Sequence, residues 1–214
     1  MAEAADNILL GGSVLDAMSH QATFLGRHRE AANLARAART GTRAAATATL
    51  TAHFYAMEAR ALAAGGDAIG SERALGEAVR AFERRRPGDD PQWIAYFDDS
   101  ELSAELSHCF RDVGRAADAV TYAQRSLDVG RNASARSDFF VTMVLAEGYL
   151  ARGEVEQACQ TARQALELGE RLKSARCAEY LRRFCHGIKP HFAIAEVREL
   201  AEYGAGHPLW MAAA

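Results

Sequence analysis

Hydrophobic residues recur every three or four positions along most of the chain, which is the spacing of one face of an α-helix. The stretch "SHCFRDVGRAADAVTYAQRSLDVG", residues 107–130, contains two such runs on either side of Gly114. Runs of alternating apolar and polar residues, typical of strands, are absent. The pattern predicts an all-α protein. The predicted helices cover residues 6–25, 28–41, 46–64, 67–85, 91–113, 116–130, 134–151, 154–172, 174–187 and 191–203.

A glycine between two helical runs occurs four times, at Gly26, Gly66, Gly114 and Gly153. These glycines are 40, 48 and 39 residues apart, a period typical of stacked helical hairpins. We expect each glycine to end the first helix of a hairpin in a left-handed conformation. Small residues follow the glycines and let paired helices approach closely. The sequence predicts an α-solenoid of about five helix pairs that forms a right-handed superhelix, as a single domain over residues 1–214. The predicted repeats cover about residues 10–42, 48–86, 91–130, 134–172 and 174–204.

The residues around the third and fourth glycines resemble the tetratricopeptide repeat, in which a large apolar residue, a small residue, an aromatic residue, the turn glycine and alanines follow in order. The third repeat supplies Leu106, Ser107, Phe110, Gly114, Ala119 and Leu127. The fourth supplies Leu145, Ala146, Tyr149, Gly153, Ala158, Ala165 and Leu166. The first two repeats match loosely, no proline closes a repeat, and the period is longer than the usual ~34 residues.

Five segments together resemble the C-terminal sensor part of actinobacterial helix-turn-helix transcriptional regulators of the Xre type. They are "QATFLGRHREAANLARAARTGTR", "TLTAHFYAMEARALAAGGDA", "DDPQWIAYFDDSELSAELSHCFRDVGR", "RSDFFVTMVLAEGYLARGEVEQAC" and "SARCAEYLRRF". The resemblance spans roughly residues 6–188 and implies a module that senses a ligand or peptide. In that family a DNA-binding domain precedes the repeats, and we expect this chain to lack it. The alternative is a stand-alone scaffold that holds a segment of a partner protein in its concave groove.

Composition narrows the classes of function. The net charge of −3 and the pI near 6.2 argue against direct contact with nucleic acid, which requires a basic face. No signal peptide and no apolar run of ~18 residues occurs, so we expect a cytoplasmic chain without a membrane anchor. The four cysteines form no CxxC pair, which predicts reduced, mostly buried thiols and neither metal nor cofactor. Because motifs of known catalytic sites are also absent, we expect no enzyme.

In a stack of hairpins the first helices line a concave face, where polar and aromatic side chains suit a peptide, a small signal molecule or a partner protein. The helical register assigns two to three residues of each repeat to this face. They are Asp16 and His20, then His53 and Arg60, then Glu101, His108 and Arg111, then Phe140, Met143 and Glu147, and finally Arg176, Tyr180 and Arg183.

Several of these residues allow other interpretations. His20, His53 and His108 occupy similar positions in successive repeats, so they could contact a ligand, form a polar ladder or bind a metal. The glutamates could simply pair with arginines of neighbouring helices. Phe140 and Met143 could pack against the next repeat. We expect groove residues such as His108 and Arg111 to be replaceable by alanine with little effect on stability. We expect the apolar tail at residues 207–214 to dock on the last helices or to contact a second copy in a homodimer.

Overall fold

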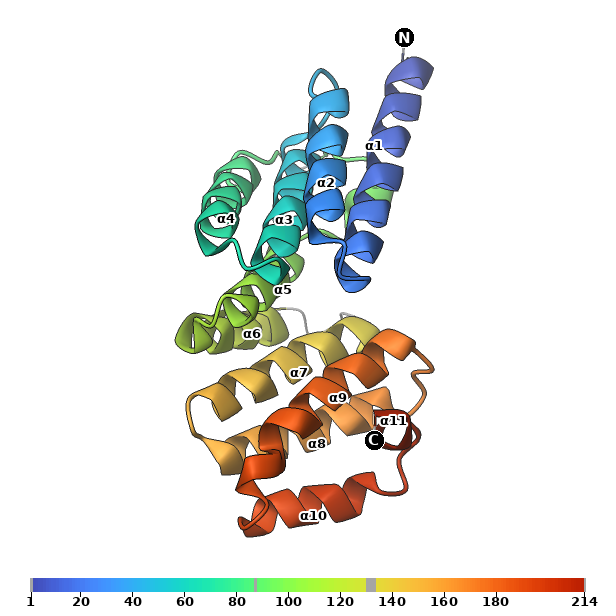
Figure 1. The fold of residues 1–214 in the computed structure, drawn as a ribbon. Helices are drawn as coiled ribbons and strands as arrows, with labels where there is room; N and C mark the ends of the chain where they lie inside the picture. Colours follow the sequence, from blue (N-terminus) through green and yellow to red (C-terminus); the bar gives the residue numbers. More distant parts are fainter. Residues whose placement is uncertain (1, 87, 130–133, 214) are drawn as a thin grey trace. The chain divides into compact units, whose positions relative to one another are not determined.

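The computed structural model describes residues 2–86, 88–129 and 134–213, with the side chains from residue 7 onwards (Figure 1). Every regular element among these residues is a helix, which confirms the all-α prediction. The helices pack as sequential hairpins within two compact units, Met1–Val113 and Gly114–Ala214. The single-domain organisation stays a prediction.

The first unit is built around its third helix, α3. Its elements are α1 (Ala2–Phe24), α2 (His28–Thr42), α3 (Ala48–Ala64), α4 (Ala68–Phe82), the 3-10 helix η1 (Gln92–Ile94) and α5 (Asp99–Asp112). Helix α3 packs against α1, α2, α4 and α5, and its Leu50 and Phe54 are fully buried. It is therefore buried on almost every side, and its buried residues include His53, Glu58 and Arg60 as well as apolar side chains.

The second unit repeats this arrangement around α7. Its elements are α6 (Ala116–Val129), α7 (Ala135–Ala151), α8 (Val155–Gly169), α9 (Ala175–Ile188), the 3-10 helix η2 (Lys189–His191), α10 (Ala195–Gly204) and α11 (Pro208–Ala213). Helix α7 packs against α6, α8 and α9, and α8 packs against α10. The C-terminal tail forms α11 and packs on α9, with Leu209 buried. Docking of the tail within its own unit is thus confirmed.

Glycine forms the turn at each of the four predicted positions. Gly26, Gly66, Gly114 and Gly153 have φ angles of 76°, 83°, 78° and 79°. In this left-handed region a Cβ atom clashes with the backbone, so glycine is strongly preferred. The prediction of a left-handed glycine at each turn is confirmed.

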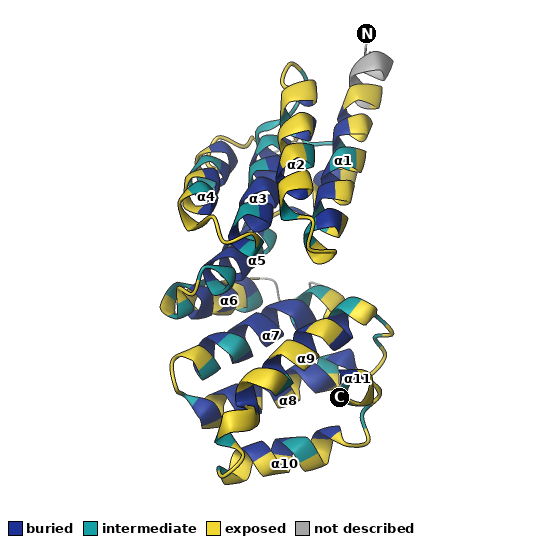
Figure 2. Cartoon of the chain, in the orientation of Figure 1, coloured by how far each residue is buried: buried dark blue, intermediate teal, exposed yellow. Residues whose placement is uncertain are grey.

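Alanine lines the contact between paired helices. On α2, Ala31, Ala35 and Ala38 have no exposed surface, and Ala158 and Ala162 of α8 are likewise fully buried. Figure 2 shows the result: α3 and α7 are buried along most of their length, whereas α2 and α8 keep one exposed face. Close contact through small side chains therefore defines the hairpins of both units.

The single helix predicted over residues 91–113 is wrong. The chain instead forms η1, breaks, and begins α5 at Asp99. Asp98 causes the restart, because its Oδ1 accepts hydrogen bonds from the backbone N–H groups of Ser100 at 2.8 Å and Glu101 at 3.1 Å. An aspartate that caps a helix in this way favours a helix start over continuation.

No helix in the described part of the chain is both long enough and apolar enough to cross a membrane.

We predict that Ala158→Leu destabilises the second unit. Ala158 has no exposed surface on α8, and extra methylene groups at such a contact cost about 1–3 kcal/mol of unfolding free energy. Urea unfolding followed by circular dichroism measures the loss. Gln160→Leu on the same helix is the control, because Gln160 is exposed and should change stability by less than about 0.5 kcal/mol. Equal stability of both variants would contradict the assigned packing.

Candidate functional site

The first helices of the first unit bring several predicted groove residues together. Helices α1, α3 and α5 pack side by side, α3 in the middle. Asp16 lies on α1, His53 and Arg60 lie on α3, and Glu101 lies on α5. Asp16, His53 and Arg60 are buried, more deeply than the lining of an open groove requires.

His53 is the centre of a polar chain. Its Nδ1 lies 3.2 Å from Asp16 Oδ2 and its Nε2 lies 3.3 Å from the hydroxyl of Tyr96. The ring also packs edge-on against Phe97, with centroids 4.6 Å apart. Burial alone would lower the pKa of His53, but Asp16 and the acids Glu105 and Glu101 on α5 raise it above its ordinary value. These acids therefore favour the protonated form of the imidazole, which lies between α1 and the segment that leads into α5.

Tyr96 was not predicted as a site residue. Its side chain is 56% exposed, and burial of its hydroxyl, with the nearby acids, raises its pKa to about 12. The phenol stays protonated at neutral pH and contacts the buried histidine. The sequence predicted a continuous helix over residues 91–113, so it did not place Tyr96 in the segment between η1 and α5 from which it contacts His53.

Arg60 pairs with a second residue that the sequence analysis missed. Its Nη1 donates to Oε2 of Glu105 at 2.5 Å, and both side chains are largely buried. Burial would raise the pKa of Glu105, but Arg60 and His20 lower it below its ordinary value. Glu105 lies one helical turn after Glu101, so the same register that selected Glu101 also points to it.

His108 and Arg111 are structural rather than open to a groove. His108 is 3% exposed, and the guanidinium of Arg111 donates to Asp112 Oδ1 at 2.9 and 2.7 Å with its side chain 7% exposed. Truncating a buried, paired side chain leaves its partner unsatisfied, at a cost of about 1–3 kcal/mol or more for a charge. The expectation that both tolerate alanine without loss of stability is therefore corrected.

The first helices of the second unit place aromatic rings beneath a cation. The rings of Phe140 on α7 and Tyr180 on α9 meet with centroids 4.9 Å apart. The guanidinium of Arg176 lies 4.3 Å from the Phe140 ring centre and 5.7 Å from that of Tyr180. Arg176 is partly exposed, and the rings below it are buried.

About two helical turns further along, Glu147 of α7 and Arg183 of α9 form a two-point ion pair. Arg183 donates to Glu147 Oε1 at 3.1 Å and to Oε2 at 2.7 Å. The arginine side chain is 49% exposed and that of the glutamate 10%. Met143, predicted on the same face, is a correction: it has no exposed surface and belongs to the core. We call the surface formed by Phe140, Glu147, Arg176, Tyr180 and Arg183 the α7–α9 face.

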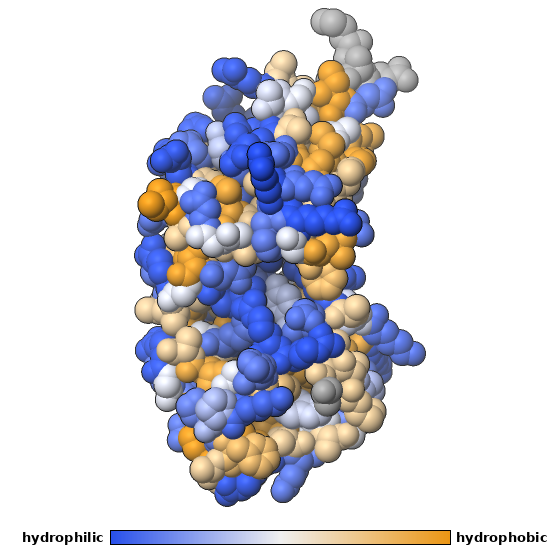
Figure 3. Space-filling view, in the orientation of Figure 1, coloured by the Kyte–Doolittle hydropathy of each residue, from blue (hydrophilic) through white to orange (hydrophobic). Residues whose placement is uncertain are grey.

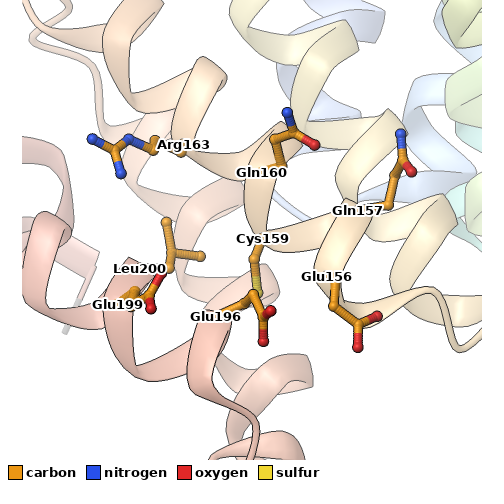
Figure 4. Close-up of a pocket in the computed structure, with 8 residues that line it drawn as sticks. All are labelled: Glu156, Gln157, Cys159, Gln160, Arg163, Glu196, Glu199 and Leu200. Carbon is orange, nitrogen blue, oxygen red and sulfur yellow. The ribbon is translucent and has the colours of Figure 1, made fainter.

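A cleft of about 350 Å³ lies between α8 and α10 of the same unit (Figure 4). Glu156, Cys159 and Arg163 of α8 lie opposite Glu196 and Glu199 of α10. Arg163 is already engaged, because its guanidinium stacks 4.1 Å from the ring centre of Tyr203 and lies 3.7 Å from Glu167. Burial raises the pKa of Cys159 to about 11, so its thiol is unreactive at neutral pH. The cleft is thus lined by acidic groups, and their arrangement indicates no particular ligand or reaction.

The described residues contain no cluster of three or more His, Cys, Asp or Glu side chains arranged to hold a metal ion. His53 contacts Asp16 and Tyr96 rather than another histidine. All four cysteines are free thiols, three of them buried.

Helix α1 exposes apolar side chains along one face. From residue 7 to residue 25 no charged residue is exposed, and Figure 3 shows apolar side chains gathered over this helix. The large exposed residues are Ile8, Leu10, Val14, Met18, Phe24 and Leu25. This face is compatible with a contact to another helix, and the homodimer stays a prediction.

Comparison with known proteins supports the fold. Two crystal structures of a Podosopora anserina protein, described as a putative kinesin light chain with nearly identical TPR-like repeats, are similar to this chain. For the first, a variant with one substitution, the TM-score is 0.59 at 16% sequence identity, covering 89% of this chain and 91% of that one. The other structure gives a TM-score of 0.59 at 16% identity, covering 94% and 93%. This likeness shows a TPR-like helical repeat fold. No family model matches the chain, and no curated protein is similar to it in sequence.

We predict that protonation of His53 stabilises the first unit. Because its folded pKa lies above the unfolded value of about 6.5, the stabilisation is complete below that pH and is lost as the pH rises through the folded pKa. The difference in unfolding free energy between the natural protein and His53→Gln should therefore shrink as the pH rises. Urea unfolding followed by Trp93 fluorescence in a Trp210→Phe background measures it. A difference that is constant from pH 5.5 to 8.5 would contradict the assignment.

Proposed function

We propose that the protein acts by binding rather than by catalysis, and that its α7–α9 face holds an extended acidic segment of a partner protein. The TPR-like fold supports a role as an interaction scaffold, since stacked helical hairpins present their first helices as a binding surface. The observation that carries the proposal is the partly exposed guanidinium of Arg176, positioned over the rings of Phe140 and Tyr180.

Arg176 is suited to receive a carboxylate. It stacks on the rings, and no acidic side chain pairs with it among the described residues. Stacking fixes the planar group before a ligand arrives, so binding costs less side-chain entropy. Arginine also presents its N–H donors in a fork that matches a carboxylate.

Arg183 supplies a second, weaker contact. Glu147 neutralises much of its charge, yet half of its side chain is exposed. Arg176 and Arg183 lie seven residues apart on α9, about 10 Å along the helix axis. Three residues of a peptide in the polyproline II conformation cover about the same distance, and this conformation places side chains i and i+3 on the same side. The partner segment should therefore carry an acidic side chain that pairs with Arg176. The side chain three positions away, which meets Arg183, should be acidic or polar.

The finer proposal is that this module is the sensor part of a transcriptional regulator of the Xre type. It rests on the resemblance of the five segments quoted above. A gel-shift assay on the full native gene product with operator DNA tests it. A specific DNA complex whose affinity changes at least tenfold with the bound acidic peptide supports the regulator. A native product that binds no DNA overturns it and leaves the scaffold.

We predict that Arg176→Gln weakens binding of acidic peptides about tenfold, because one charge-assisted hydrogen bond contributes about 1.5–3 kcal/mol. Arg183→Gln should weaken it less, since Glu147 already engages that group. Fluorescence anisotropy with labelled 12-residue peptides that carry two glutamates three positions apart measures the affinity. Peptides with glutamine at both positions should bind weakly to all variants.

The matched control is Arg163→Gln. Arg163 also stacks on an aromatic ring, at 4.1 Å from Tyr203, but it lies on α8. If Arg163→Gln weakens the peptide as much as Arg176→Gln does, the binding follows overall charge and the α7–α9 face is not the site.

A further inference from the structure

A second hollow in the Gly114–Ala214 unit has a different chemistry. It encloses about 410 Å³ between the end of α9, η2, α10 and α11. Its apolar lining comes from Ile188, Phe192, Val197, Leu200, Ala201, Trp210 and Ala213. Volumes of about 300–1,000 Å³ with mostly apolar walls are typical of sites for small molecules. The proposed peptide-binding role does not use this cavity.

The docked tail builds one wall of the cavity. Trp210 of α11 packs directly on the backbone of Gly204, where a Cβ atom would lie 2.4 Å from the indole ring. Arg182 of α9 donates to the carbonyl oxygen of Ala212 at 3.2 Å, and Leu209 is buried. The tail is thus fixed to α9, and the indole has a defined position at the cavity.

The charged residues of the lining have one sign. Arg182 and His186 of α9 and Lys189, the first residue of η2, are spaced at i, i+4 and i+7 and line the cavity, and no acidic residue does. Arg182 is paired with Glu179. Lys189 is exposed and has no carboxylate partner among the described residues. One cation therefore remains available at an apolar hollow.

We propose that this cavity binds a small carboxylic acid with an apolar body, such as a medium-chain fatty acid. The carboxylate pairs with Lys189 of η2, and His186, three residues earlier near the end of α9, lines the same cavity. The hydrocarbon body packs on Trp210, Phe192 and Leu200. Burying the hydrocarbon supplies the affinity, at roughly 0.8 kcal/mol per CH₂ group, and the cation selects an acid over a neutral molecule of the same length.

The test is a titration with decanoate, followed by the fluorescence of Trp210. The chain has two tryptophans, so Trp93→Phe leaves Trp210 as the reporter. We expect saturable binding of decanoate and at least fivefold weaker binding of decanol. Equal affinity for the acid and the alcohol overturns the role of Lys189, and no saturable change with either overturns the site.

Two variants locate the ligand. Lys189→Gln should weaken decanoate about fivefold and leave decanol unchanged, whereas Lys173→Gln, the change of the chain's other lysine, should alter neither. Ala201→Phe should fill the cavity and abolish binding of both. Because Lys189 is exposed, its variant is expected to fold, which circular dichroism verifies. Unchanged decanoate affinity in Lys189→Gln contradicts the proposal.

Discussion

The close approach of paired helices is the constraint on which the rest of this structure depends. Fully buried alanines on α2 and α8 let each second helix contact its first helix almost at the backbone. A glycine in the left-handed region forms the tight turn between them. Several charged and aromatic side chains lie instead where α1, α3 and α5, or α7 and α9, meet. Hairpin packing thereby determines where functional groups can lie.

The two units use these first-helix faces differently. In the first unit, Asp16, His53, Arg60 and Glu105 pair with one another and are largely buried. Buried charges that satisfy each other hold helices together at little net gain in stability, but losing one partner is costly. In the second unit the arginines remain at least partly exposed over buried rings and a glutamate. The buried pairs of the first unit hold its helices together, whereas the arginines of the second unit are exposed enough to contact a partner.

Periodicity and glycine spacing were sufficient to predict most of the helices and the four turns, because both follow from local backbone geometry. The register also placed Asp16, His53 and Arg60 on facing helices. The helical register does not predict how deeply a side chain is buried. Met143 and His108 lie beneath the surface, because burial depends on the residues that pack above them. The η1 break and Tyr96 were missed, since a side-chain cap and a loop position leave no periodic signal. The docked α11 wall that completes the second cavity depends on tertiary contact alone.

Hydrogen–deuterium exchange of the full chain, with and without a saturating acidic peptide, tests the central claim that the first helices of the second unit are the binding surface. Protection should appear in α7 and α9, residues 135–151 and 175–188, and leave α8 and α10 unchanged. Protection confined to α8 and α10, or spread evenly over both units, would contradict the account.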